Sequence, residues 1–429
     1  MRIAYIIPGS GGSFYCENCV RDIDLVNAIR RLGHDVTVVP MYLPSFVEDS
    51  DAKSSLPLFY GAINVYLTYR FPVLRKAPLW FTRLLDSPLL LNVAARKAGS
   101  TRAASLGELT LSLLSGEEGA HAEELERLVS VLRDDARPDI VHLSNALLLG
   151  LVRRIKQETA LPVTCLLQDE DTWVDAMDHR SAKLVWGILT ERAAEVDAFI
   201  PVSQYYADKM QEKMKIPKKR LHVTYYGIEL EHYSPAALCL TPPVIGFLSR
   251  TSKPQGVELL AEAFIHLKRD KLLHEAKLRI AGGYTGDDRK FIKGLKKRFG
   301  QSGVLEDVEF VQGFDRENRI RFLRSLSVLS VPALSGQAFG SYLIEALALG
   351  VPVVQPELGG FPELIRETGG GIVYSPNSVE PLTEALRTLL VNPEKAEALG
   401  RQGSASVHKK FCIDTTAKRL LRIYSACLA

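Results

Sequence analysis

Two polar side chains, Gln337 and Glu345, stand eight positions apart in the C-terminal half of the chain. Between them lies Phe339-Gly340-Ser341, and from Gly340 onward apolar residues repeat at helical spacing until Gly350. The amides that begin a helix lie at the positive end of its dipole, where a phosphate binds. Glu345 falls more than one turn into the helix, within reach of a ribose attached to that phosphate. The stretch therefore predicts a nucleotide site.

Strands on either side must position this helix. The run Ser327–Val331 is apolar and ends at Pro332, as a buried parallel strand does, and Val351–Val354 after the helix reads as another strand. The order strand, loop, helix, strand is that of an open α/β sheet, in which ligands bind beyond the carboxyl ends of the strands.

The N-terminus repeats this order. Residues 3–7 form an apolar strand, a glycine loop with Gly11 and Gly12 follows, and a helix over 22–32 leads to a second strand. The loop lies at the edge where ligands bind, so Gly11 and Gly12 are candidate binding residues. Pro40 and Met41 follow the second strand where a dinucleotide-binding protein places an acid, so the pattern disfavours NAD.

The alternation of strands and helices predicts an α/β protein with two doubly wound, Rossmann-like domains. The 429 residues suffice for two domains, each with its own core. We place the first domain at 1–238, with a long insertion at about 44–138, and the second at 239–410. The last residues, 411–429, form an amphipathic helix.

Composition excludes several classes of protein. The chain is 46% hydrophobic and 24% charged, as a soluble globular protein is, and its net charge of +3 is too small for a dedicated nucleic-acid binder. No apolar run reaches the length of a membrane span, and the apolar N-terminal run is too short for a signal peptide. We expect a cytoplasmic protein.

The insertion contains a basic and aromatic segment, residues 70–85. Such a segment could rest on the anionic inner face of a membrane or grip an acceptor. Alternatively, it forms a helix that covers the edge of the sheet with its basic ends in water.

Cys16 and Cys19 form a Cys-x-x-Cys motif. A zinc site would need a second pair of ligands at suitable spacing, which the sequence lacks. At the start of a helix the pair could be redox-active. The alternative is two small residues that pack a tight loop, and we expect no bound metal.

The Gln337–Val354 stretch resembles the signature of retaining GT-B glycosyltransferases, especially family four: two acids eight apart, Phe-Gly between them, a helix, and Gly350 before Pro352-Val353-Val354. The second acid matches at Glu345, and Gln337 replaces the first. In this family the first acid contacts the donor sugar and the second holds the ribose. The resemblance thus implies these roles for Gln337 and Glu345.

Upstream, the stretch from Arg250 to Gly256 resembles a further family pattern, a Gly-Arg strand end and a Lys-Gly turn whose arginine and lysine hold the two phosphates. Arg250 keeps the arginine, whereas Gln255 replaces the lysine and Lys253 stands two residues earlier. An ammonium has enough reach for Lys253 to serve instead.

Two more positions are carried over from the resemblance. Gln168, at the end of the strand 161–167, stands where family members place a histidine that touches the sugar, and Gly313-Phe314 stands where they place a turn against the base. Asp169, Glu170 and Asp171 follow Gln168 and could bind acceptor hydroxyls or a divalent ion, or cap the next helix.

The resemblance implies the GT-B fold, in which the two domains face a cleft and the C-terminal helix, 411–429, packs back on the first domain. It also implies a retaining glycosyltransferase that moves a sugar from a nucleoside-diphosphate sugar to an acceptor hydroxyl of a glycan, polysaccharide or glycolipid. Arg250, Gln337 and Glu345 would act in catalysis, with neither a metal nor another cofactor. Two alternatives stay open: a nucleotide-sugar-binding protein with little turnover, and an epimerase or phosphorylase of the same fold.

Overall fold

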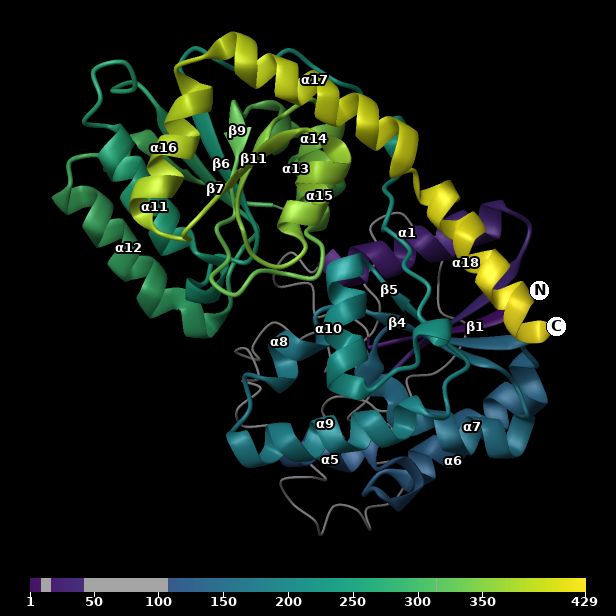
Figure 1. The fold of residues 1–429 in the computed structure, drawn as a ribbon. Helices are drawn as coiled ribbons and strands as arrows, with labels where there is room; N and C mark the ends of the chain where they lie inside the picture. Colours follow the sequence, from purple (N-terminus) through teal and green to yellow (C-terminus); the bar gives the residue numbers. More distant parts are fainter. Residues whose placement is uncertain (9–16, 42–106, 314) are drawn as a thin grey trace. The chain divides into compact units, whose positions relative to one another are not determined.

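The computed structural model describes residues 1–8, 17–41, 107–313 and 315–429 (Figure 1). They form two compact units. The first unit holds the described residues of Met1–Gly12 and Asn18–Tyr225 together with Thr416–Ala429, and the second unit holds Tyr226–Thr415. Each unit has its own parallel sheet, which confirms the prediction of two Rossmann-like domains.

In the first unit, the described strands form a parallel sheet in the order β2-β1-β3-β4-β5. Every strand is largely buried, because helices cover both faces of the sheet. Figure 1 shows α1 and α18 on one side and α5, α6, α7 and α9 on the other. The strand bounds are Arg2–Ile7 (β1), Asp35–Pro40 (β2), Ile140–Leu143 (β3), Val163–Leu167 (β4) and Ala198–Pro201 (β5).

The helices of this unit connect consecutive strands or pack over them. They are α1 (Glu17–Arg31), α5 (Gly107–Leu114), α6 (Ala122–Ser130), α7 (Val152–Thr159), α8 (Glu170–Val174), α9 (His179–Ala193), α10 (Gln204–Met214) and α18 (Ile413–Leu428). The last of these, α18, places Tyr424 against His142 of β3, with 5.5 Å between the ring centroids. The end of the chain therefore completes the core of the first unit.

The second unit contains a parallel sheet in the order β11-β10-β9-β6-β7-β8 among its described residues. The chain runs outward from β6 through β7 to β8 and then returns to β9 on the other side of β6. The order thus reverses between β6 and β9, where an open α/β sheet binds its ligands. The bounds are Val244–Leu248 (β6), Lys277–Ala281 (β7), Val308–Phe310 (β8), Val328–Leu329 (β9), Val353–Pro356 (β10) and Gly371–Tyr374 (β11).

Helices also cover both faces of the second sheet. In Figure 1, α11, α12 and α16 lie on one side, and α13, α14 and α15 on the other. Their bounds are Val257–Leu267 (α11), Arg289–Gln301 (α12), Arg316–Arg324 (α13), Ser341–Ala348 (α14), Phe361–Thr368 (α15), Val379–Leu390 (α16) and Pro393–Lys410 (α17).

The predicted strand, loop and helix around Glu345 are confirmed as β9, the loop 330–340 and α14. All eight residues of α14 are buried. Gly340, with φ of 93°, begins the helix, and Gly350, with φ of 85°, follows it, both in the left-handed region that favours glycine. The glycines therefore set the ends of the helix.

Residues 226–238, which we assigned to the first domain, lie in the second unit. The Tyr233 hydroxyl donates to Glu345, and the Ala236 amide donates to the Leu349 carbonyl at 3.1 Å. These bonds tie the segment to α14, which is why it belongs with the second sheet.

Candidate active site

The loops that follow β6 and β9 meet at the point where the strand order of the second sheet reverses. Gly256, with φ of 75°, comes so close to the other loop that a Cβ there would lie 1.8 Å from the Pro332 carbonyl oxygen. A larger residue at 256 would push the loops apart. Residues 250–256 and 332–340 therefore form one continuous surface at the carboxyl edge of the sheet.

Gln255 and Gln337 lie across this junction and bond to each other. The Gln337 Nε2 donates to the Gln255 Oε1 at 2.9 Å, and the hydroxyl of Tyr342 donates to the Gln337 Oε1 at 2.7 Å. Both glutamines are half-buried, and Tyr342 is fully buried at the start of α14. The structure thus brings together two predicted site residues and adds a tyrosine that fixes the orientation of the Gln337 amide.

Glu345 lies on α14 and is 3% exposed. Its carboxylate accepts from the Tyr233 hydroxyl at 2.8 Å and from the Arg319 guanidinium at 3.1 and 3.2 Å. Arg319, on α13, is also 3% exposed, so this ion pair is buried. A carboxylate has about four lone-pair positions, and these three bonds leave about one for a ligand.

Arg250 lies two residues after β6, and its side chain contacts the loop after β7. Its guanidinium donates to the Asp288 Oδ2 at 2.9 and 3.0 Å and to the Thr285 hydroxyl at 2.9 Å. The same Asp288 oxygen accepts from the Thr285 amide at 3.0 Å, which completes a capping box. Arg250 is therefore held at the sheet edge in a defined orientation, and the clamp predicted between Arg250 and the start of α14 stays a prediction.

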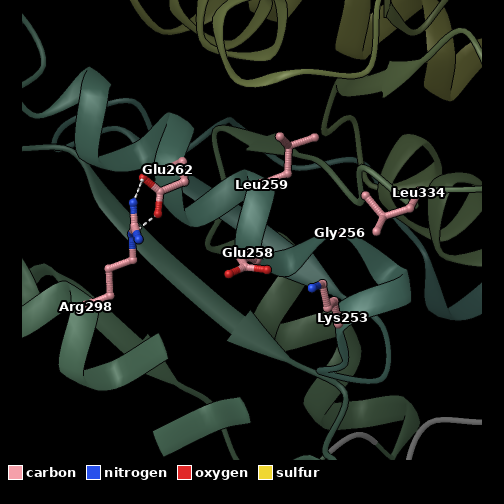
Figure 2. A pocket seen from close by; sticks show the side chains of 7 residues that line it. All are labelled: Lys253, Gly256, Glu258, Leu259, Glu262, Arg298 and Leu334. Carbon is pink, nitrogen blue, oxygen red and sulfur yellow. Dashed lines mark hydrogen bonds and ion pairs between the residues drawn. The ribbon is translucent and has the colours of Figure 1, made fainter. Parts of the chain in front are cut away.

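Lys253 lines a cavity of about 250 Å³ beside the start of α11 (Figure 2). In the described part of the chain, its ammonium has neither a hydrogen-bond acceptor nor an ion-pair partner, and Gln255 does not line this cavity. Lys253 is thus available to an anion in this cavity. The lining residues are Lys253, Gly256, Glu258, Leu259, Glu262, Arg298 and Leu334.

The start of α14 is rigidly packed. The Phe339 ring is 3% exposed and meets the Tyr226 ring edge-on at 6.4 Å, so this side chain has a structural role. A Cβ at Gly340 would lie 3.2 Å from the Phe361 ring. The amides of residues 339–341 are therefore fixed in space.

In the first unit, Gln168 follows β4 and is 3% exposed. Its Nε2 donates to the Ser144 carbonyl, and its Oε1 is buried with no partner among the described residues. This unsatisfied oxygen lies at the carboxyl edge of the first sheet, where we predicted a contact with the sugar.

Glu170 and Asp171 face inward, not toward solvent. The Glu170 carboxylate accepts from the amides of Ala146 and Gln168, at 2.9 and 2.7 Å, and from the Tyr206 hydroxyl at 2.7 Å. Burial raises the pKa of Glu170 to about 7, because lost solvation outweighs these bonds. Glu170 therefore braces the loops after β3 and β4 against α10.

Several predicted residues lie outside the described residues: Gly11, Gly12, Cys16, Phe314 and the segment 70–85. Gly313 is described, with φ of 80°, and follows β8.

Among the residues that the structure covers, no three His, Cys, Asp or Glu side chains gather as a metal site would require. None of the described helices is both long and apolar enough to cross a membrane.

Sequence reasoning missed Tyr233, Arg319 and Tyr342. Arg319 had a signal: it falls on the face of α13 that also carries Phe322 and Leu323, both buried. A charge on an apolar helix face indicates a buried partner. Nothing in the local sequence links Tyr233 to Glu345, because 112 positions separate them.

Two family models match the chain. One, described as glycosyl transferases group 1, matches residues 235–405, and the other, a glycosyl transferase 4-like domain, matches residues 23–227. The chain belongs to the GT-B glycosyltransferases of family four. As a glycosyltransferase it is an enzyme, and the group 1 match covers Arg250, Gln255, Gln337 and Glu345 of the candidate active site.

Two curated relatives of this glycosyltransferase share a name. A D-inositol 3-phosphate glycosyltransferase of Nocardia farcinica is 25% identical over 407 residues, which cover 86% of this chain and 85% of the relative. An enzyme of the same name from Streptomyces griseus is 31% identical over 172 residues, but these cover 40% of this chain and 36% of the relative.

Solved structures confirm the fold of the glycosyltransferase. Sucrose-phosphate synthase from Thermosynechococcus elongatus aligns with a TM-score of 0.71 at 17% identity, over 99% of this chain and 98% of that one. Anabaena HepE in complex with UDP and glucose aligns with a TM-score of 0.67 at 16% identity, over 99% of this chain and 100% of that one.

Proposed function

We propose that this glycosyltransferase is retaining and takes its sugar from a nucleoside-diphosphate donor, which the second unit binds at the junction of β6 and β9. The observation that carries the proposal is the position of Glu345. Its carboxylate lies on a buried helix, four residues beyond the helix start, and keeps about one free lone-pair position. A ribose hydroxyl can donate to that position while the attached diphosphate reaches the amides of residues 339–341.

The reaction requires the diphosphate to leave the anomeric carbon. The bond from this carbon to the diphosphate oxygen breaks, and the acceptor hydroxyl oxygen bonds to the carbon. The hydroxyl proton passes to the departing diphosphate, on which negative charge grows. The start of α14 and the Arg250 guanidinium supply positive potential at the sheet edge, and Asp288 holds the guanidinium in place before the reaction. The ion pair with Asp288 also means that Arg250 shares its charge with any phosphate it binds.

Names and ligands of similar proteins support a nucleotide donor. HepE is described in complexes with UDP, with UDP and glucose and with UDP-glucose. We infer a donor of this chemical class for the present enzyme, and we assign it no metal or other cofactor. The names of the curated relatives make an inositol phosphate a reasonable acceptor for the first assays.

A transfer assay tests the proposal. The enzyme is incubated with UDP- and GDP-sugars and a panel of acceptors that includes inositol phosphate, and release of the nucleoside diphosphate and the anomeric configuration of the product are measured. We expect release that depends on the acceptor, and a product with the configuration of the donor. Inverted configuration would contradict the retaining mechanism. Tight donor binding with no turnover across the panel would favour a nucleotide-sugar-binding protein.

A further inference from the structure

The Gln255–Gln337 pair has unused hydrogen-bond donors. The Oε1 of Gln337 accepts from Tyr342, and the Oε1 of Gln255 accepts from the Nε2 of Gln337. A primary amide has two N–H groups, so one N–H of Gln337 and both of Gln255 are left over. No described residue accepts from these three. Because both side chains are half-buried and not enclosed, a ligand can reach them.

Tyr342 decides which end of the Gln337 amide faces the ligand. Its side chain is fully buried in α14, so its hydroxyl is held in place. The hydroxyl donates to the Gln337 oxygen and thereby turns the NH2 group toward Gln255. The backbone holds the loop as well, because the Gly360 amide donates to the Gln337 carbonyl at 2.8 Å.

The pair lies where the sugar of a bound donor is expected. Gln337 precedes the start of α14 by four residues, and Gln255 ends the loop that begins at Arg250. If the diphosphate binds between Arg250 and α14, the sugar attached to it lies next to these amides. Assigning these amides to the donor sugar therefore rests on the proposed function.

We infer that Gln255 and Gln337, with Tyr342 as a positioning residue, form a sugar subsite that takes an anionic donor, a nucleoside-diphosphate hexuronic acid. A carboxylate accepts hydrogen bonds and donates none, which matches the three N–H groups left over on the two amides. Neither glutamine carries a negative charge that would repel the sugar. A glutamate at 337 would place two carboxylates in one site, which is strongly unfavourable.

Calorimetry with the full chain tests this inference. UDP and GDP are titrated first, and each diphosphate that binds is then compared as its hexose and its hexuronate: UDP-glucose with UDP-glucuronic acid, or GDP-mannose with GDP-mannuronic acid. We expect the hexuronate to bind at least about fivefold tighter than the hexose. In Gln337→Glu the preference should reverse, while the Kd of the diphosphate alone changes by less than about twofold.

Two variants separate this role from general effects. Gln301→Glu adds the same charge at the exposed end of α12 and should leave the hexuronate-to-hexose ratio unchanged. Tyr342→Phe should lower the ratio toward one without weakening the diphosphate, because the Gln337 amide can then turn. A Tyr342→Phe variant that weakens diphosphate, hexose and hexuronate alike would show a purely structural role and contradict the assignment of Tyr342.

The outcomes distinguish the two proposals. Failure of both UDP and GDP to bind would overturn the proposed function and, with it, this inference. Binding of a diphosphate together with an equal or greater affinity for the neutral hexose would overturn the anionic subsite alone. An N-acetylhexosamine donor that binds more tightly than the hexuronate would likewise overturn it, since an acetamido oxygen would then be the preferred acceptor.

Discussion

Gln337, in the loop after β9, donates a hydrogen bond of 2.9 Å to Gln255, in the loop after β6. At these two positions the family pattern has a glutamate and a lysine. In this chain both side chains are uncharged, so the two loops meet through an amide–amide hydrogen bond and not through an ion pair.

A double-mutant cycle on this pair should show strong coupling. Gln337→Glu alone sets a carboxylate beside the Gln255 oxygen, and Gln255→Lys alone sets an ammonium beside the Gln337 NH2 group. Together they form an ion pair. Urea unfolding should give a favourable interaction energy of about 0.5–3 kcal/mol for the double variant. Effects that add within about 0.3 kcal/mol would mean that the two side chains do not interact.

Glu345→Gln should destabilise the protein strongly. The change leaves the buried Arg319 without its counter-charge, which costs about 3–5 kcal/mol in the free energy of unfolding. Glu397→Gln, which removes an exposed ion pair with Arg401, should cost less than about 1 kcal/mol. Denaturant unfolding of both variants checks this prediction. If both variants lose less than about 1 kcal/mol in the free energy of unfolding, the Glu345–Arg319 pair is not buried in solution.

Arg250→Gln should impair catalysis more than stability. Removing one group that stabilises the leaving diphosphate lowers kcat by about 10²-fold or more. The ion pair with Asp288 is partly exposed, so unfolding should change by about 1 kcal/mol or less. Arg298→Gln, at the cavity beside α11, provides the matched control and should retain wild-type kcat. A full-rate Arg250→Gln variant would remove Arg250 from the mechanism.

His142 should make the protein sensitive to acid. Burial lowers its pKa from 6.5 to about 3, and its ring lies between Tyr5 and Tyr424. The unfolded chain protonates this histidine below pH 6.5 and the folded chain does not. The stabilisation is therefore complete above pH 6.5 and is lost as the pH falls toward 3, by about 2 kcal/mol at pH 5.

The variant His142→Phe isolates this effect. Asp22 and Glu170, whose pKa values burial raises to about 7, act in the opposite direction over the same range, so wild type alone does not report on His142. The difference between the unfolding free energies of wild type and variant, measured from pH 7 to pH 5, should change by about 2 kcal/mol. A constant difference would mean that His142 has the same pKa in the folded and the unfolded protein.

Local patterns were enough to predict the elements around the site. The apolar run before Pro332 and the helical spacing after Gly340 correspond to β9 and α14, because burial and glycine geometry are encoded in adjacent residues. The partners of the site residues could not be predicted in this way. Gln255 and Gln337 are 82 positions apart and meet because β6 and β9 are neighbours, although β7 and β8 separate them in the sequence.

The charged residues show the same limit. The sequence assigned Arg250 to the diphosphate, and the structure adds Asp288, which lies after β7, as an ion-pair partner. Glu345 was predicted from its place in a helix, whereas its burial with Arg319 and Tyr233 depends on α13 and on the segment before β6. The place of a residue within one helix or loop could be predicted from the sequence. Its partners on other helices and loops could be found only from the structure.

A crystal structure of the enzyme with UDP or GDP, whichever binds, tests the central claim most directly. The account predicts a ribose hydroxyl within hydrogen-bond distance of the Glu345 carboxylate and a diphosphate between the start of α14 and the Arg250 guanidinium. A nucleotide bound elsewhere on the chain, with Glu345 contacting Tyr233 and Arg319 alone, would contradict it.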